Sequence, residues 1–184
     1  TKLTQDQQSP LFNRAIAGNT YSPGSAFKII DAVAALESGK YDEKSVIDNP
    51  AQLPLPGTNV TLPNFVNGQC ATRTQATIEW ALAQSCNTPF ANIALDLGQE
   101  KISQTASKFG YGQDLSIPLK VTKSDFPSDM TKSQLAQASV GQYDVKTTPL
   151  QVAMTSAAIA NGGVQMKPNL VRSVKTSNLS TLSE

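Results

Sequence analysis

Residues 21–30 read Tyr-Ser-Pro-Gly-Ser-Ala-Phe-Lys-Ile-Ile, which places Ser25 three residues before Lys28 at the start of an apolar segment. Residues three apart lie on the same face of a helix, so the Lys28 ammonium can reach the Ser25 hydroxyl if this segment is helical. Backbone N–H groups in the first turn lack intrahelical partners, and the helix dipole there favours negative charge. The pattern therefore predicts a hydroxyl beside both a base and an anion-binding position.

The flanking residues favour a helix over about residues 23–38. Ser22 suits the N-cap, Pro23 suits the first helical position, and Gly39 suits the residue after the last turn. Residues 29–36 are almost entirely apolar, which predicts that the helix is buried. A buried helix start is a place where pKa values shift.

Ser25 is a poor nucleophile until a base removes its proton. The chain contains no histidine, which excludes a Ser-His-Asp triad within it. Lys28 is the nearest candidate base, and it must be neutral to act, a state that burial favours by lowering its pKa. A bare Ser-x-x-Lys spacing also arises by chance, so the helical context rather than the spacing supports a catalytic pair.

The composition bounds the class of protein. A chain of 184 residues is long enough for one domain with a hydrophobic core. Its formal net charge of +1 is spread along the chain, which argues against nucleic acid or an anionic membrane surface as a partner. No apolar run approaches the ~20 residues of a membrane span, and the N-terminal residues do not read as a signal peptide. Because the chain opens on Thr1, we expect it to be a fragment.

Cys70 and Cys86 are the two cysteines. Without histidines or a carboxylate cluster they cannot form a zinc site, so we expect no metal and no cofactor. They form either a disulfide, worth about 3 kcal/mol in the chain-entropy model, or two buried free thiols. The residues leave both readings open, and an exported location would favour the disulfide.

Hydrophobic periodicity and capping residues predict further helices, two of which open on a Thr-Pro pair. We expect helices at residues 74–84, 88–97, 99–109, 133–140 and 148–160, extended segments and turns at 41–72, a loop at 111–130, strand material at 164–174 and a polar end at 175–181. Ser85, Cys86 and Asn87 form a tight connection between two helices, which presents their side chains at a fixed point. On their own, Asn87 and the Thr88 after it could be helix caps without any catalysis.

Together these motifs resemble the transpeptidase domain of penicillin-binding proteins, in particular class B enzymes of an actinobacterial type. The resemblance runs from about residue 13 to residue 172. It rests on Asn13-Arg14-Ala15, residues 21–28, Ala83-Gln84-Ser85-Cys86-Asn87-Thr88, Val140-Gly141-Gln142, Thr148-Pro149-Leu150-Gln151 and Asn161-Gly162-Gly163. Each motif alone is weak, and their order and spacing together are specific.

The resemblance implies a role for each matching residue. Ser25 matches the nucleophile that attacks the penultimate D-alanine carbonyl of a peptidoglycan stem peptide. Lys28 matches its proton acceptor, although the base is disputed among relatives. Ser85 matches the serine that passes a proton to the departing amine, and Asn87 matches the amide that holds the lysine and the substrate. Both are therefore expected to bind substrate as well as to act in catalysis.

The fold implied is α+β, of the penicillin-binding transpeptidase and serine β-lactamase-like type, with this chain carrying mainly the helical part. We expect residues 1–184 to be one partial domain, incomplete at both ends. The family's N-terminal hairpin is missing, and its third motif, a Lys-Thr-Gly strand, is expected beyond residue 184. Lys146-Thr147-Thr148 and Lys175-Thr176-Ser177 are the nearest strings, and we expect both to be decoys. Tyr143 departs from the glycine that many relatives carry after Gly-Gln.

The function implied is that of a peptidoglycan D,D-transpeptidase, which cross-links stem peptides through a serine acyl-enzyme and is acylated by β-lactams. Its partners would be stem peptides, the rest of the domain and division or elongation proteins. It would lie on the extracytoplasmic face of the cell membrane, anchored by an N-terminal segment. That location would favour the Cys70–Cys86 disulfide.

Three alternatives use the same residues. A β-lactamase-like hydrolase or D,D-carboxypeptidase would let water reach the acyl-enzyme quickly. A β-lactam sensor would be acylated and only signal, and a structural partner in cell-wall assembly would not be acylated at all.

Overall fold

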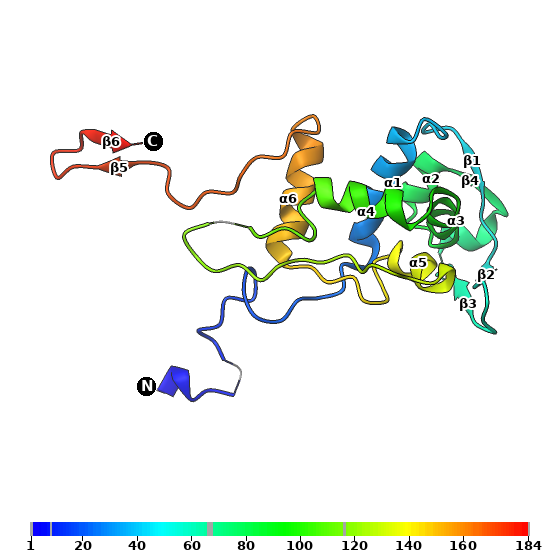
Figure 1. Cartoon of the computed structure of the whole chain (residues 1–184), viewed down its shortest axis with the longest axis horizontal. Helices are drawn as coiled ribbons and strands as arrows, with labels where there is room; N and C mark the ends of the chain where they lie inside the picture. The colour runs from blue at the N-terminus through cyan, green and yellow to red at the C-terminus, as the bar shows by residue number, and fades with distance from the viewer. Residues whose placement is uncertain (1, 8, 66–67, 116, 184) are drawn as a thin grey trace.

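The computed structural model describes residues 2–7, 9–65, 68–115 and 117–183. It shows a helical body from which a C-terminal arm extends (Figure 1). The helices are the 3₁₀ turns η1 (Lys2–Thr4), η2 (Gly24–Phe27) and η3 (Gln69–Thr72) and the α-helices α1 (Lys28–Glu37), α2 (Ile78–Ala83), α3 (Thr88–Leu97), α4 (Gln99–Lys108), α5 (Lys132–Ala138) and α6 (Pro149–Ala160). The strands are β1 (Val46–Asp48), β2 (Gln52–Pro54), β3 (Thr61–Pro63), β4 (Gln75–Thr77), β5 (Val174–Lys175) and β6 (Thr181–Ser183), which form three antiparallel pairs.

Helix α1 lies between two hydrophobic clusters, which explains why its sequence is apolar on more than one face. One cluster joins Phe27 and Ile30 to residues from α4, α5 and α6 and from the loop after α4. The other joins Ala32 and Ala35 to residues from β1, β4, α2 and α3 and to both cysteines. The helix that begins beside Ser25 is therefore the centre of the core.

Short strands connect the helices on one side of this core. β1 pairs with β4, and β2 pairs with β3 to form a hairpin beside α3 (Figure 1). Leu55, the residue after β2, packs with Ala91 of α3 and Ala136 of α5. The hairpin is thereby fixed against α3, whose start follows the Ser85-Cys86-Asn87 connection, called the second motif below.

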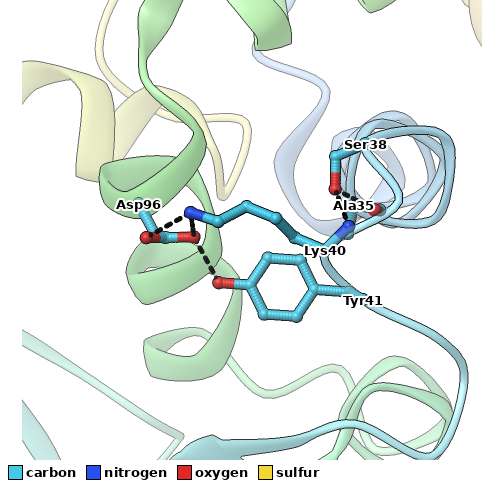
Figure 2. A network of polar contacts seen from close by, with 5 residues as sticks. All are labelled: Ala35, Ser38, Lys40, Tyr41 and Asp96. Carbon is cyan, nitrogen blue, oxygen red and sulfur yellow. Dashed lines mark hydrogen bonds and ion pairs between the residues drawn. The ribbon is translucent and has the colours of Figure 1, made fainter.

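A surface network ties the end of α1 to the end of α3 (Figure 2). The Lys40 ammonium lies 2.9 and 2.7 Å from the two carboxylate oxygens of Asp96, and the Tyr41 hydroxyl donates to the same carboxylate at 2.5 Å. Partial burial, followed by the hydrogen bond to Asp96, raises the pKa of Tyr41 to about 12. The network is exposed, so it contributes little to the free energy of unfolding and serves mainly to orient the two helices.

Several expected helices are confirmed, and their starts differ in instructive ways. The first helix spans a 3₁₀ turn and then α1, and the predicted Ser22 N-cap is wrong, because Pro23 occupies that position without a side-chain bond. The expected helix at 74–84 begins at Ile78, since Gln75–Thr77 pairs with β1 and Thr77 accepts a hydrogen bond from the backbone N–H of Trp80 as N-cap.

Two later expectations also need correction. Thr88 is the first residue of α3 rather than its N-cap, and Asn87 takes the cap position. Residues 164–173, which were expected to hold strand material, contain no strand. The polar end beyond them, for which no strand was predicted, forms the β5–β6 hairpin at the tip of the arm (Figure 1). By contrast, Thr148 caps α6 as predicted, accepting from the backbone N–H of Gln151.

Among the described residues, no helix is both long and apolar enough to cross a membrane.

Candidate active site

The first motif is held by the aromatic residue between its serine and its lysine. Phe27 is 1 % exposed and stacks on Phe126 at 5.2 Å, with the Tyr111 ring edge-on at 5.6 Å. Ser25, two residues earlier on the 3₁₀ turn, is exposed, whereas Lys28 is fully buried. The Ser25 side chain is therefore exposed, whereas the amine three residues later is buried.

Two glycines bring a second loop against this turn. Gly24 has φ +55° and donates its N–H to the Gly141 carbonyl at 3.0 Å. A Cβ on Gly141, which has φ +69°, would lie 2.0 Å from the Gly24 carbonyl oxygen. Only glycine permits this backbone contact, which fixes the residue before Ser25.

Lys28 brings the predicted catalytic residues together. Its ammonium nitrogen lies 3.1 Å from Ser25 Oγ, 3.2 Å from Ser85 Oγ and 2.7 Å from Asn87 Oδ1, and it donates to the Ser85 carbonyl oxygen at 2.6 Å. Ser25 belongs to the same helical segment, while Ser85 and Asn87 arrive from nearly 60 residues along the chain, at separations of 57 and 59. The other three residues expected to be catalytic, Ser25, Ser85 and Asn87, therefore meet at the amine of Lys28.

Counting donors shows how the amine can act as a base. The Ser85 carbonyl and the Asn87 amide oxygen can only accept hydrogen bonds, and they are the two shortest contacts. A neutral lysine has two N–H donors, which these two oxygens use. Its remaining lone pair then lies toward the hydroxyls of Ser25 and Ser85. The geometry therefore suits removal of a proton from Ser25.

Burial makes the neutral form accessible. It lowers the pKa of Lys28 from 10.5 to about 8, and attraction from Asp31 opposes this shift. Asp31 lies one turn further along α1, fully buried, and burial raises the pKa of its carboxyl well above the usual range. Neither of its carboxyl oxygens has a hydrogen-bond partner among the described residues.

Ser85 is presented by the end of α2. The N–H of Cys86 bonds to the Ala81 carbonyl at 2.8 Å and that of Ser85 to the Leu82 carbonyl at 3.0 Å, the pair of bonds that defines a Schellman motif. Ser85 then occupies the left-handed position of the motif, with φ +57°. Glycine is usual there, so the serine holds a strained conformation beside the reacting groups.

Cys86, the middle residue of the second motif, fixes this motif to the core through a disulfide. It is fully buried and forms a disulfide with Cys70 of η3, with Cα atoms 5.5 Å apart. Its neighbours Ser85 and Asn87 point to Lys28. The covalent link thus holds the connection between α2 and α3 against the core.

The sequence did not identify three buried polar residues that surround these groups, Asp31, Asn49 and Asn64. Asp31 could have been noticed as a lone charge within an apolar helix. Asn49 and Asn64 lie in a segment rich in proline and asparagine, where nothing local distinguishes them.

The strings expected to be decoys lie in other surroundings. Lys146 forms an ion pair with Asp144 at 3.1 Å, and Thr147 pairs through its backbone with Tyr21. Lys175 is in β5 on the C-terminal arm, and Tyr143 is 43 % exposed with φ +55°. Within the described ranges, no group of three or more His, Cys, Asp or Glu could hold a metal ion.

An exposed serine beside a buried lysine, with a second serine and an amide on the same amine, is an arrangement that suits serine acyl transfer without histidine. Residues 1–183 match the family model of the penicillin binding protein transpeptidase domain, and the chain belongs to this family. Within the family it is closely related to the class B enzyme PbpA of mycobacteria.

The peptidoglycan D,D-transpeptidase PbpA of Mycolicibacterium smegmatis is 41 % identical over 183 residues, and that of Mycobacterium tuberculosis is 36 % identical. Each alignment covers 99 % of this chain and 37 % of the relative, so the chain spans little more than a third of the relatives' length.

Solved structures agree in fold. An imipenem acyl-enzyme complex of penicillin-binding protein A from M. tuberculosis superposes with a TM-score of 0.91 at 36 % identity, covering 99 % of this chain and 42 % of that one. The D,D-transpeptidase domain of a peptidoglycan glycosyltransferase from Eggerthella lenta gives 0.88 at 30 % identity, with 100 % and 47 % covered. The fold is therefore that of a penicillin-binding transpeptidase, mostly helical in this chain.

Proposed function

We propose that this chain carries the nucleophile and the proton-transfer groups of a peptidoglycan D,D-transpeptidase. The observation that carries the proposal is the convergence of Ser25, Ser85 and Asn87 on the buried amine of Lys28. Supporting it, the relatives named D,D-transpeptidases align over nearly the whole chain. Because the chain spans just over a third of those relatives, the activity belongs to the whole protein that contains it.

In this proposal, Ser25 Oγ attacks the carbonyl carbon of the penultimate D-alanine while Lys28 accepts its proton. The N–H of Ser25, in the first turn of its helix, donates to the oxyanion. The tetrahedral intermediate then collapses as the C–N bond breaks, and the departing D-alanine amine takes a proton passed through Ser85. An ester on Ser25 and free D-alanine result.

The second half reverses these roles. The amine of a second stem peptide attacks the ester and gives its proton to the same groups, and Ser25 regains its own proton as the C–O bond breaks. Asn87 holds both Lys28 and the peptide backbone of the substrate. A β-lactam enters the first half only, because its ring opens and no leaving group departs.

The proposal also covers location and partners. The protein would act outside the cytoplasmic membrane on stem peptides, anchored by a segment N-terminal to this chain and assembled with division or elongation proteins. A third motif outside this chain would complete the site, so residues 1–184 form a partial domain.

Intact mass measurement with benzylpenicillin tests the proposal on the natural protein that contains this chain. We expect a persistent adduct that peptide mapping places on Ser25 and that Ser25→Ala abolishes. Ser133→Ala is the matched control, because Ser133 is a buried helical serine outside the site, and it should be acylated normally. A folded wild type without an adduct would contradict the proposal, and rapid loss of the adduct would indicate a hydrolase.

A further inference from the structure

Asn87 occupies the N-cap of α3 but does not cap it. An asparagine at this position ordinarily accepts a hydrogen bond from the backbone N–H groups of the first turn. Here its side chain makes no such bond. Its Oδ1 accepts from the Lys28 ammonium at 2.7 Å, and its Nδ2 donates to the Pro63 carbonyl at 2.8 Å. The start of α3 therefore needs another acceptor.

Asn64, from the segment that follows β3, supplies that acceptor. Its Oδ1 accepts from the backbone N–H of Asn87 at 2.7 Å and from that of Thr88 at 3.1 Å. Asn64 is 23 residues before Asn87 in sequence and 3 % exposed. It caps the helix start from a distance, and one of the two N–H groups that it satisfies belongs to the residue in the cap position itself.

The Asn64 amide is itself fixed through its nitrogen. Nδ2 donates to Asn49 Oδ1 at 2.7 Å and to Thr88 Oγ1 at 3.0 Å, with a longer contact of 3.2 Å to the Pro50 carbonyl. Asn49 in turn donates to the carbonyl of Cys70, the disulfide partner of Cys86. These contacts define one orientation of the Asn64 amide, with its oxygen toward α3.

We propose that Asn64 is a positioning residue of the acyl-transfer site, which caps α3 so that the Asn87 side chain is free to hold Lys28. The inference rests on the proposed function for its catalytic readout. Without Asn64, the backbone N–H groups of Asn87 and Thr88 would lose their acceptor and would compete for Asn87 Oδ1, because an asparagine side chain can accept from its own or a neighbouring backbone N–H. Lys28 would then lose one of its two shortest contacts.

The test uses the natural protein and separates the binding constant of benzylpenicillin from the first-order acylation rate constant. Asn64→Ala should lower the acylation rate constant by about tenfold to about hundredfold while changing binding little, since a misplaced catalytic group costs rate. Asn92→Ala is the matched control. Asn92 also lies on α3 and donates to the Asp48 carbonyl, away from the site, so its removal should leave the rate constant unchanged.

A double-mutant cycle distinguishes positioning from general loss of structure. If Asn64 acts through Asn87, Asn64→Ala should cost less than about a further twofold in the Asn87→Ala background. Additive losses, or a folded Asn64→Ala protein that is acylated at the wild-type rate, would overturn the inference. Should Asn64→Ala not fold, Asn64→Ser serves instead, because a small neutral hydroxyl places no charge beside Asn49 Oδ1 and the Pro50 carbonyl, to which the Asn64 amide nitrogen donates. Its shorter side chain no longer reaches the helix start, so it should lower the rate constant as Asn64→Ala does. A folded Asn64→Ser protein that is acylated at the wild-type rate would equally overturn the inference.

A second readout does not depend on acylation. NMR titration of labelled lysine should show a lower pKa for Lys28 in Asn64→Ala than in wild type, because an amide oxygen that accepts from the ammonium favours its charged form. Asn92→Ala should not change it. If wild type forms no adduct on Ser25, the proposed function fails. A lower Lys28 pKa in Asn64→Ala but not in Asn92→Ala would still support the capping role in that case. A Lys28 pKa that is the same in Asn64→Ala as in wild type would overturn the capping role.

Discussion

Ser85 combines a hydroxyl that contacts Lys28 with a left-handed backbone, φ +57°, at the end of α2. A non-glycine residue in this conformation costs about 1 to 2 kcal/mol. The position needs a side chain only because the hydroxyl contacts Lys28 at 3.2 Å. Stability and activity should therefore respond to substitution in opposite directions.

We predict that Ser85→Gly raises the free energy of unfolding by up to about 1 kcal/mol, the relieved strain exceeding the added entropy of the unfolded chain. The same change should lower acylation by at least about a hundredfold, because a proton-transfer group is lost. Ser85→Ala is the matched control, which should lose activity equally without gaining stability. Urea denaturation and benzylpenicillin kinetics measure both, and an equal stability for the two variants would contradict the prediction.

The lowered pKa of Lys28 predicts that both acylation and the free energy of unfolding depend on pH. Its pKa of about 8 means that the neutral base becomes abundant only near that pH. The second-order acylation rate constant should therefore rise with pH up to about 8 and then level off. The unfolded chain has the ordinary pKa of 10.5, so it binds more protons between about 8 and 10.5, and the free energy of unfolding contributed by Lys28 rises with pH over that window.

Asp31 supplies the control for this profile. Attraction from its carboxylate opposes the lowering of the Lys28 pKa, and no other charged group among the described residues has a resolved effect on it. Asp31→Asn removes that attraction and keeps the size of the side chain. The rise of the acylation rate constant with pH should therefore occur at lower pH in Asp31→Asn than in wild type. If both proteins show the rise at the same pH, Asp31 is already neutral there.

At the scale of elements, the disulfide joins the turn η3 to the connection between α2 and α3. It closes a loop with a sequence separation of 16, for which the chain-entropy model gives about 3 kcal/mol. The Cys70→Ala/Cys86→Ala variant should lose about that much free energy of unfolding and be acylated more slowly, because Cys86 lies between Ser85 and Asn87. Reductant should lower the Tm of wild type and leave that of the variant unchanged. A reductant effect on both would exclude the disulfide as its cause.

The contact between the η2 turn and the loop after α5 predicts a second effect. Gly141→Ala would place its Cβ 2.0 Å from the Gly24 carbonyl oxygen. Overpacking and left-handed strain together should cost about 3 kcal/mol. Gly162→Ala is the matched control, because φ is +66° there and nothing lies within 4 Å, so strain of about 1 kcal/mol should be its only cost. Chemical denaturation of both variants measures the difference. An equal loss of the free energy of unfolding in the two variants would contradict a steric clash between residue 141 and the Gly24 carbonyl.

Over the whole molecule, the sequence predicted what local spacing determines. The contact of Lys28 with Ser25 follows from a three-residue separation, and the start of α6 follows from Thr148-Pro149. The Thr88-Pro89 pair looks the same in sequence, yet the helix there begins one residue earlier than a Thr88 cap implies. Asn64 satisfies the backbone N–H groups, which leaves the Thr88 hydroxyl to donate to the Pro50 carbonyl.

Other features depended on partners that are distant in sequence. Gln75–Thr77 is a strand because β1 lies alongside, nearly 30 residues earlier, although its residues continue a helical pattern. The resemblance to a known family, rather than the local pattern, brought Ser85 and Asn87 into the site. Neither route could reveal Asn64, since its role exists only once the segment after β3 packs against α3.

The convergence on Lys28 has a consequence for biogenesis. Ser25 and Lys28 are neighbours as soon as their helix forms, but the amine is desolvated and oriented only after residues nearly 60 positions later have docked. A newly made chain should therefore be unreactive toward electrophiles such as β-lactams, because its lysine is still hydrated and protonated. Covalent labelling by a fluorescent penicillin in living cells would then report the time course of folding, because it would label only molecules in which Ser85 and Asn87 have docked against Lys28.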